Sequence, residues 1–356
     1  MQNEKSDLIF DKNSKVFIIA EAGSNWRMGS SESDLKMAKN LIEVAADVGA
    51  DAVKFQTYKP ETVYVKNAGK SDYLSDVGIK KPITEIFDDL SMPYEMIPLL
   101  AEHCSKHKIQ FMSTPFSVLD AKAVDPFVKI HKIASYEISH SRLIEFLAKT
   151  GKPLIMSSGA ATMDEIKWAL DYFYENGGKK ISLMQTTAKY PTPFQSLNLR
   201  VIPSLRDRFK VPVGLSDHSL DPIIGPVSAV SLGAKIIEKH FTINKKLPGP
   251  DHSFALEPDE LKMMVNAIRN CEKSLGSEEK IVQSEEKELR EYAQRSIQAI
   301  KPIKKGDALR ETINIDILRS GKQKKGLHPK YLPDIEGKKA TRDIPEGDGI
   351  SQNDYE

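Results

Sequence analysis

The chain lacks several features that would assign it to particular classes of protein. Its 356 residues include only two cysteines, Cys104 and Cys271, too few for a disulfide framework or a thiolate metal site. We expect both to be inert thiols on helices. No apolar run reaches the length that spans a bilayer, and residues 1–15 lack the apolar segment of a signal peptide. These absences predict a protein of the reducing cytoplasm with no membrane partner.

A strong net charge is also missing. Lys and Arg number 51 and Asp and Glu number 50, which leaves a net charge of +1. No bulk electrostatic field therefore favours nucleic acid as a partner. Hydrophobic residues make up 40% and charged residues 28% of the chain, ordinary proportions for a globular protein. The length suits a large barrel with a smaller appendage.

The chain does contain a regular alternation of short apolar runs and longer amphipathic stretches. Eight runs are expected as buried strands, at 16–23, 52–57, 109–114, 127–135, 153–158, 181–187, 212–218 and 234–242. Helical patterns are expected at 33–48, 94–107, 141–149, 163–174, 222–232 and 259–275. Such alternation indicates parallel strands joined by crossover helices, and eight strands are the number that closes a barrel. We therefore predict an α/β fold, a (β/α)8 TIM barrel, with a doubly wound open sheet as the alternative.

The character of the chain changes along its length, which predicts a division into domains. Residues 1–276 are expected to form the barrel, and the polar stretch 277–294 a linker. Residues 295–356 are turn-rich and β-like, and are expected to form a small, mostly β domain. Residues 58–86, which include Tyr64 and Tyr73, are long for a loop and are predicted to cover the mouth of the barrel.

The last two predicted strands each end in a histidine, at His218 and His240. Parallel neighbouring strands would place these imidazoles side by side. Together with Asp217, Glu238 and Asp251 they could hold a divalent metal or transfer protons. The alternative is that they are strand-end histidines engaged only in hydrogen bonds.

Polar side chains also interrupt or end the other predicted strands. A lysine in a buried strand is costly unless it is paired, so Lys54 and Lys132 indicate a site for a phosphate or carboxylate. The alternative is an internal ion pair with Glu21 or Glu137. These glutamates could instead be acid-base groups with shifted pKa values, or bind sugar hydroxyls. The accompanying polar side chains are Gln56, Thr114, Ser135, Ser157, Thr187 and Tyr190.

Eight segments carry most of these residues. In order they read Ile-Ala-Glu-Ala-Gly-Ser-Asn, Val-Lys-Phe-Gln, Ser-Thr-Pro-Phe, Lys-Ile-Ala-Ser-Tyr-Glu, Tyr-Pro-Thr-Pro, Leu-Ser-Asp-His-Ser, Ile-Glu-Lys-His-Phe-Thr and Gly-Pro-Asp-His-Ser. The set resembles the N-acetylneuraminate (sialic acid) synthase family over nearly the full length of the chain. The C-terminal part resembles that family's SAF (antifreeze-like) domain, with Arg319, Ser320 and Gly321 matching its Arg-Pro-Gly segment.

The resemblance implies a phosphoenolpyruvate-dependent nonulosonic acid synthase of (β/α)8 fold. Such an enzyme condenses phosphoenolpyruvate with an N-acetylmannosamine-type aldose and water, giving a nine-carbon 2-keto sugar acid and phosphate. The aldose would be N-acetylmannosamine, its 6-phosphate or a diacetamido-dideoxy analogue, and the product of sialic, legionaminic or pseudaminic type.

The resemblance also implies roles for individual residues. His218 and His240 would bind Mn2+ or Mg2+ and, with Glu21 and Glu137, form the catalytic set, in which Glu137 handles the protons of water. Arg319 would reach the active site of the partner subunit in a domain-swapped homodimer. Phosphoenolpyruvate would be bound by Lys54, Thr114, Lys132, Ser135 and Ser157, and the acceptor sugar by Glu21, Gln56, Tyr190 and Asp251.

The chain departs from the family pattern at three places: Trp26 stands where histidine is common, Ala188 where asparagine is common, and Ser320 in place of proline. These departures leave the identity of the acceptor open. Two other functions remain alternatives: a metal-dependent aldolase or isomerase that does not use phosphoenolpyruvate, and a non-catalytic sugar-phosphate binder.

Overall fold

The computed structural model describes residues 14–70 and 81–356. The N-terminal residues 1–13 and residues 71–80, which include Tyr73 of the predicted mouth loop, lie outside the described residues. The chain divides into two compact units, Met1–Gly276 and Ser277–Glu356.

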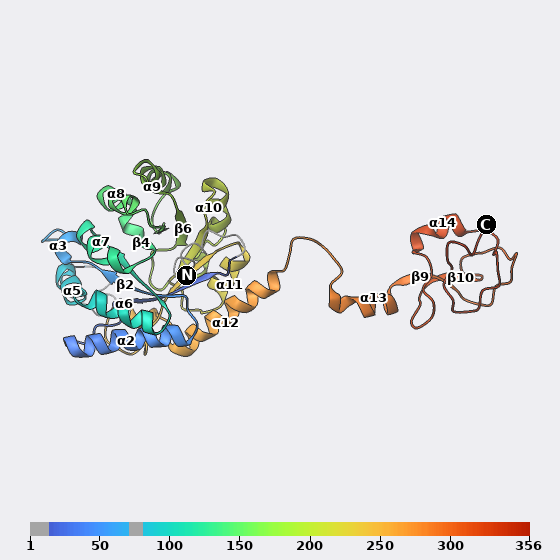
Figure 1. Cartoon of the computed structure of the whole chain (residues 1–356), viewed down its shortest axis with the longest axis horizontal. Coiled ribbons are helices and arrows are strands. Elements are labelled where there is room, and N and C mark those ends of the chain that lie inside the picture. The colour runs from blue at the N-terminus through green and yellow to red at the C-terminus, as the bar shows by residue number, and fades with distance from the viewer. Residues whose placement is uncertain (1–13, 71–80) are drawn as a thin grey trace. The chain divides into compact units, whose positions relative to one another are not determined.

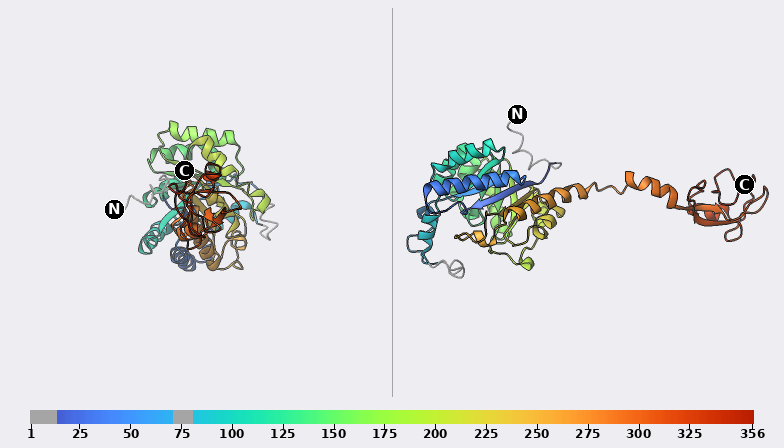
Figure 2. Two further views of the ribbon diagram at one scale, coloured as in Figure 1. Left: turned by 90° about the vertical axis from the view of Figure 1, so that its right-hand side faces the viewer. Right: turned by 90° about the horizontal axis from the view of Figure 1, so that it is seen from below.

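The first unit is built on eight parallel strands, as predicted, with helices around them (Figures 1 and 2). The strands are hydrogen-bonded in the order β3-β2-β1-β8-β7-β6-β5-β4. The two end strands, β3 and β4, lie against each other, so the sheet is nearly a closed barrel. The strands are β1 (Phe17–Gly23), β2 (Ala52–Thr57), β3 (Gln110–Pro115), β4 (His131–Ile133), β5 (Leu154–Ser157), β6 (Ile181–Thr186), β7 (Val213–Asp217) and β8 (Ile236–His240).

Helices cover the outside of the strands and close the core. Their apolar stripes pack on the outward faces of the strands, for example Leu41 and Ile42 of α2 and Leu100 of α6, all fully buried. The helices are α2 (Ser31–Asp47), α3 (Pro60–Val63), α5 (Ile83–Asp89), α6 (Met96–Lys106), α7 (Val118–Val124), α8 (Ser141–Lys149), α9 (Met163–Glu175), α10 (Val201–Phe209), α11 (Ile224–Ser231) and α12 (Pro258–Leu275).

Several predicted boundaries were wrong. Helices α3, α5, α7 and α10 were not predicted. The first three have at most seven residues, and α3 and α5 begin within the predicted loop 58–86. Helix α10 carries Pro203 in its first turn, where proline is tolerated. Strand β4 is much shorter than the predicted 127–135. Short 3-10 turns lie on either side of it, at Asp125–Phe127 and Ser135–Ser139. Ser135 and Glu137 therefore lie in a turn after the strand and not at its end.

The interior of the barrel has an apolar layer followed by a polar layer. The apolar layer is a separate buried cluster that includes Ile19, Ala52, Met112, Ile155 and Ile236. Side chains two positions apart on a strand point to the same face, so the next inward positions lie directly above this layer, toward the carboxyl ends of the strands. These positions are all buried and polar: Glu21, Lys54, Thr114, Lys132, Ser157, Thr186 and Glu238.

The second unit is small and mostly β, as predicted. Strands β9 (Arg295–Ala299) and β10 (Ile315–Arg319) pair antiparallel, and isolated bridges join the turns around them. Ile297, Leu309, Ile315 and Ile350 form its buried core. The unit also contains α13 (Lys287–Ala293) and α14 (Leu332–Ile335). The division of this region into a linker and a domain at residue 295 stays a prediction.

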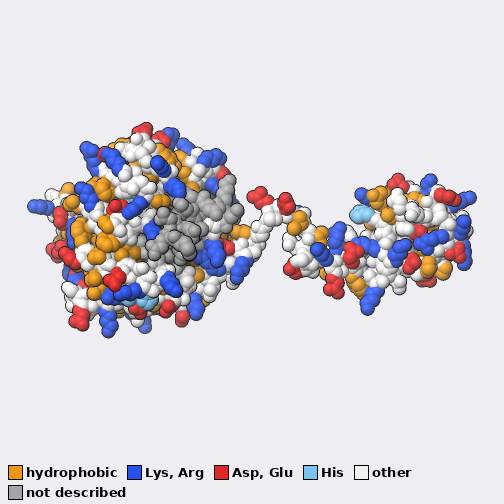
Figure 3. Space-filling model, in the orientation of Figure 1, with side chains coloured by type: hydrophobic (Ala, Val, Ile, Leu, Met, Phe, Trp, Pro, Cys, Tyr) orange, Lys and Arg blue, Asp and Glu red, His pale blue; other side chains and the backbone are white. Residues whose placement is uncertain are grey.

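Basic and acidic side chains alternate over the visible surface of both units (Figure 3). Among the described helices, none is both long enough and apolar enough to cross a membrane. Cys104 and Cys271 are buried free thiols on α6 and α12. Burial raises the pKa of Cys104 to about 12, which keeps this thiol in its unreactive form.

Candidate active site

The polar layer of the barrel connects two buried lysines through shared partners. The Lys54 Nζ lies 2.6 Å from Glu21 Oε2 and donates a hydrogen bond to Thr114 Oγ1 at 2.9 Å. The Lys132 Nζ donates to Ser157 Oγ at 2.6 Å. One oxygen of Glu238, Oε1, lies 3.7 Å from the Lys54 Nζ and 3.8 Å from the Lys132 Nζ. The two cations thus share a single carboxylate.

These contacts identify the counter-ions of the two lysines. The ion pair between Lys54 and Glu21, expected under the alternative interpretation, is present. Lys132 is not paired with Glu137, and its nearest carboxylate is Glu238. The sequence favours Glu238 as a potential metal ligand and does not predict its position between the lysines. Its position two residues before His240, on the same face of β8, was the signal for it.

Burial shifts several pKa values of this cluster toward neutrality. It raises the pKa of Glu21 to about 7, although Lys54 opposes the shift. It also raises the pKa of Glu137 to about 7 and lowers that of Lys132 to about 8. For Glu238, burial is outweighed by Lys132 and Lys54, and its pKa falls. Groups that titrate near pH 7 inside a barrel mouth are suited to proton transfer.

The two histidines at the ends of β7 and β8 face the same space, as predicted. Their ring centroids are 5.7 Å apart. The carbonyl of Thr187 can only accept, so His218 donates its Nδ1 proton to it, at 3.0 Å, and leaves Nε2 unprotonated. Burial lowers the pKa of His218 to about 4 and that of His240 well below its usual value. Both imidazoles are therefore neutral, which is the metal-binding form.

The surroundings of the histidines fit a divalent metal ion. The buried Nδ1 of His240 has no hydrogen-bond partner among the described residues, and Asp251 Oδ2 lies 3.9 Å from it. Gly23 permits this approach, because a Cβ there would lie 2.9 Å from Asp251 Oδ2 and 3.4 Å from the His240 ring. Two neutral imidazoles and a carboxylate form a donor set that divalent ions accept. The ring of Tyr190 stacks on His218 at a centroid distance of 4.1 Å.

Asp217 does not join this donor set, contrary to the sequence analysis. It points outward, where its Oδ2 lies 2.7 Å from the Lys239 Nζ, and a Cβ added at Gly225 of α11 would lie 2.7 Å from the same oxygen. The register of the strands explains the difference. Residue 216 on β7, residue 218 directly after it, and residues 238 and 240 on β8 face inward. Asp217 and Lys239 therefore face the helices.

The remaining predicted site residues are placed as follows. Gln56 Nε2 donates to Glu21 Oε1 at 3.0 Å, at the edge of the lysine cluster. Ser135 Oγ accepts the Gly159 N–H at 3.0 Å. Arg319 belongs to the second unit, where it is exposed at the end of β10 and lies opposite Arg295.

Two of the three departures from the family pattern have a structural account. Trp26 is a buried core residue, packed among the apolar side chains of the barrel unit. Ser320 is buried after β10, and its hydroxyl donates to the Glu291 carbonyl at 3.4 Å. This contact ties the segment after Arg319 to α13. Ala188 is partly buried in the loop after β6, and nothing in the structure explains it.

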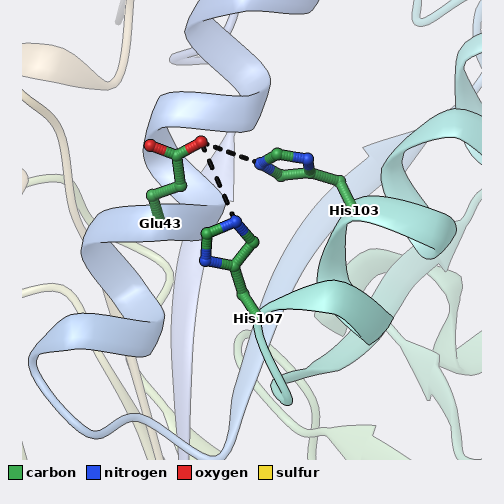
Figure 4. Close-up of side chains that lie close together, drawn as sticks. All are labelled: Glu43, His103 and His107. Atoms are coloured by element: carbon green, nitrogen blue, oxygen red, sulfur yellow. Dashed lines mark hydrogen bonds and ion pairs between the residues drawn. The ribbon is translucent and has the colours of Figure 1, made fainter.

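A second group of potential metal ligands lies on the outer helices: Glu43 of α2, His103 of α6 and His107, which caps α6 (Figure 4). The sequence analysis missed it. The signal was present, because two histidines four residues apart share one face of a helix.

Comparison with known proteins relates the two units to described families. The NeuB family model matches residues 41–280, and the SAF domain model matches residues 294–356. A Campylobacter jejuni pseudaminic acid synthase is 37% identical over 350 residues, covering 98% of each chain. An N,N'-diacetyllegionaminic acid synthase of the same species is 37% identical over 342 residues, covering 95% of this chain and 99% of that protein. The crystal structure of the Bacillus subtilis spore coat polysaccharide biosynthesis protein SpsE is 39% identical, with a TM-score of 0.63 and coverage of 97% of this chain and 96% of that chain.

Proposed function

The chain belongs to the NeuB family of nonulosonic acid synthases and carries a SAF domain, and on this basis we propose that it condenses phosphoenolpyruvate with an N-acetylmannosamine-type aldose and water. The products are a nine-carbon 2-keto sugar acid and phosphate. The relatives named as pseudaminic and diacetyllegionaminic acid synthases favour a diacetamido-dideoxy aldose as the acceptor.

The observation that carries the proposal is the pair of buried lysines that share one carboxylate. Burial raises the pKa of Glu21, the second carboxylate beside Lys54, to about 7, so near neutral pH Glu21 and Glu238 do not fully balance the two lysines. Such a cluster, lined by the hydroxyls of Thr114 and Ser157, favours a phosphate and a carboxylate over a neutral sugar. Phosphoenolpyruvate carries both groups. An aldolase or isomerase that acts on a neutral sugar has no need of two buried cations.

His218 and His240, with Asp251 beside them, are the residues that would hold Mn2+ or Mg2+. When bound, the ion would act as a Lewis acid on the aldehyde oxygen of the acceptor. Tyr190, packed against His218, and Gln56, bonded to Glu21, would contact the acceptor and orient it.

The reaction joins C3 of phosphoenolpyruvate to the aldehyde carbon while water adds to C2. The C2–O bond to phosphate then breaks and phosphate leaves. Glu137, whose pKa lies at about 7, would accept the proton of the attacking water. Lys54 and Lys132 would stabilise the charge on the departing phosphate.

We further propose that the active enzyme is a domain-swapped homodimer, in which Arg319 of one subunit contacts the acylamino group of the acceptor bound to the other. A planar guanidinium with several fixed donors suits an amide oxygen. The guanidinium of Arg319 makes no hydrogen bond or ion pair within the described part of the chain.

The test is phosphate release from phosphoenolpyruvate in the presence of each candidate acceptor, with mass spectrometry of the product. We expect release that depends on one diacetamido-dideoxy aldose and a product whose mass is the sum of the aldose and pyruvic acid. A sugar that is cleaved or isomerised without release of phosphate would establish the aldolase or isomerase alternative.

A further inference from the structure

The outer surface of the barrel carries a second convergence of metal-binding side chains, distinct from the mouth. Glu43 lies on α2, His103 lies on α6 and His107, four residues later, caps the end of α6 (Figure 4). In a barrel of this kind the helices run back from the carboxyl ends of the strands to their amino ends. Glu43 lies four residues before the end of α2, His103 lies in the last turn of α6 and His107 directly follows that helix. All three therefore lie toward the end of the barrel opposite the mouth.

Two distances between their donor atoms bracket the separation expected around a small divalent ion. Glu43 Oε1 lies 2.9 Å from His103 Nε2 and 3.9 Å from His107 Nε2. Ligand atoms bound tetrahedrally at about 2.0–2.1 Å are roughly 3.3 Å apart, which lies between these two values. The three ligand atoms all fall within 4.8 Å of one another.

A hydrogen bond alone does not account for the position of His107. At 3.9 Å its Nε2 is beyond hydrogen-bond distance of Glu43, although its ring lies 4.6 Å from that of His103. The Nε2 atoms of His103 and His107 therefore both point at Glu43 Oε1, but only that of His103 is within hydrogen-bond distance of it. A cation between the three atoms would satisfy both.

The supporting elements are rigid and electrostatically favourable. Helices α2 and α6 pack together through buried side chains such as Leu41 and Leu100, so the two backbones that carry the ligands are fixed. His107 caps the carboxyl end of α6, and the partial negative charge at that end favours a cation. The side chains are 16% exposed for His103, 35% for His107 and 45% for Glu43, which leaves room for water as a further ligand.

We propose that Glu43, His103 and His107 form a second metal site, one that takes a borderline divalent transition-metal ion, with Zn2+ as the best match. Two imidazoles and one carboxylate are a donor set for zinc, and the hard ions Mg2+ and Ca2+ prefer oxygen ligands. The bound ion links α2 to α6 and stabilises the barrel at the end away from the chemistry. The site is independent of the proposed reaction.

The test measures the stoichiometry of Zn2+ binding to the full-length protein after bound metal ions have been removed with a chelator. The parent is a His218→Ala, His240→Ala variant, so that any bound ion belongs to another site. We expect this parent to bind one equivalent of Zn2+ by calorimetry, and the further changes His103→Ala and His107→Ala to abolish that equivalent. Glu102→Gln is the matched control, because it removes a neighbouring carboxylate on α6 that is paired with Lys106 and is not a ligand. It should leave zinc binding unchanged.

Two further measurements guard against a misfolded variant. Co2+ in place of Zn2+ should give the visible absorption of a low-coordinate site in the parent and not in the variant without His103 and His107. Zinc should raise the melting temperature of the parent, because it binds only the folded state, while both proteins melt alike without metal. A parent that binds no zinc, or a zinc equivalent that persists after both histidines are removed, would overturn the proposal.

In the otherwise wild-type chain, His103→Ala with His107→Ala should leave phosphate release intact.

Discussion

At the scale of single residues, Glu238 is a carboxylate that lies close to both buried lysines. Its Oε1 lies within 4 Å of the two ammonium groups, and it is the main carboxylate that opposes the loss of the Lys132 proton. The pKa is about 8 for Lys132 and about 7 for Glu137. Between these two values Glu137 is ionised and can act as a base, while Lys132 is still protonated and positively charged.

The first prediction follows from these two values. Below about pH 7 Glu137 is protonated and cannot accept a proton from water, and above about pH 8 Lys132 is neutral and no longer attracts the phosphate. We expect kcat/KM for phosphoenolpyruvate to be bell-shaped, rising through the first pKa and falling through the second. Initial rates at low phosphoenolpyruvate concentration across the neutral range measure it.

A Glu238→Gln variant sharpens this prediction. Removing the negative charge disfavours protonated Lys132, so the alkaline limb should move to lower pH, while the acid limb stays near its original position. Glu145→Gln, which removes a carboxylate on the surface of α8, should shift neither limb. An alkaline limb that does not move in Glu238→Gln would show that another group sets it.

The second prediction concerns the lysines themselves. Lys54→Ala and Lys132→Ala should each weaken the use of phosphoenolpyruvate by about 2–5 kcal/mol in kcat/KM, because each removes a desolvated cation from an anion site. Steady-state kinetics with each substrate varied in turn measures the effect. Lys149→Ala, which removes an exposed lysine paired with Glu145, should have no effect. If only the KM for the acceptor rises, that lysine belongs to the acceptor site.

At the scale of secondary-structure elements, the ends of β7 and β8 are held by a buried ion pair outside the barrel. The Lys239 Nζ lies 2.7 Å from Asp217 Oδ2 and donates to the Ser219 carbonyl at 2.6 Å. Asp217 directly precedes His218, and Lys239 directly precedes His240. The pair therefore fixes the two strand ends from which the imidazoles project into the mouth.

The third prediction tests this pair. Lys239→Met leaves Asp217 buried without a counter-ion and should lower the free energy of unfolding by about 3–5 kcal/mol. Lys304→Met, which breaks the exposed pair with Asp343, should cost far less, because water screens an exposed ion pair. Denaturant unfolding of both variants gives the comparison. Equal losses in the two variants would contradict a special role for the buried pair.

The sequence was most informative where strand periodicity and chemistry coincide. The eight strands were predictable from their apolar runs, and the pairing of Lys54 with Glu21 was anticipated as one of two interpretations. The outward position of Asp217 follows from the register of β7, which the local sequence does not define. The cluster of Glu43, His103 and His107 was not predicted. It depends on the tertiary contact between α2 and α6, and the local sequence contains only the spacing of the two histidines.

At the scale of the whole molecule, the question is how the second unit contributes to the site. Arg319 is exposed at the end of β10, and the hydrogen bonds of Ser320 to Glu291 and of Gly321 to Tyr292 hold the following segment against α13. These two hydrogen bonds limit the conformations of the segment that follows Arg319.

The last prediction is that mixing two defective proteins restores activity. Arg319→Ala and His240→Ala subunits should each be nearly inactive alone. If Arg319 acts on the partner's barrel, a mixed dimer has one site with both defects and one intact site. With random exchange half of the dimers are mixed, so about a quarter of the wild-type activity should return. The measurement is phosphate release after subunit exchange, which is verified by differently tagged chains. If Arg319 instead acts within its own chain, every site in a mixed dimer keeps one defect, and no activity returns despite complete exchange.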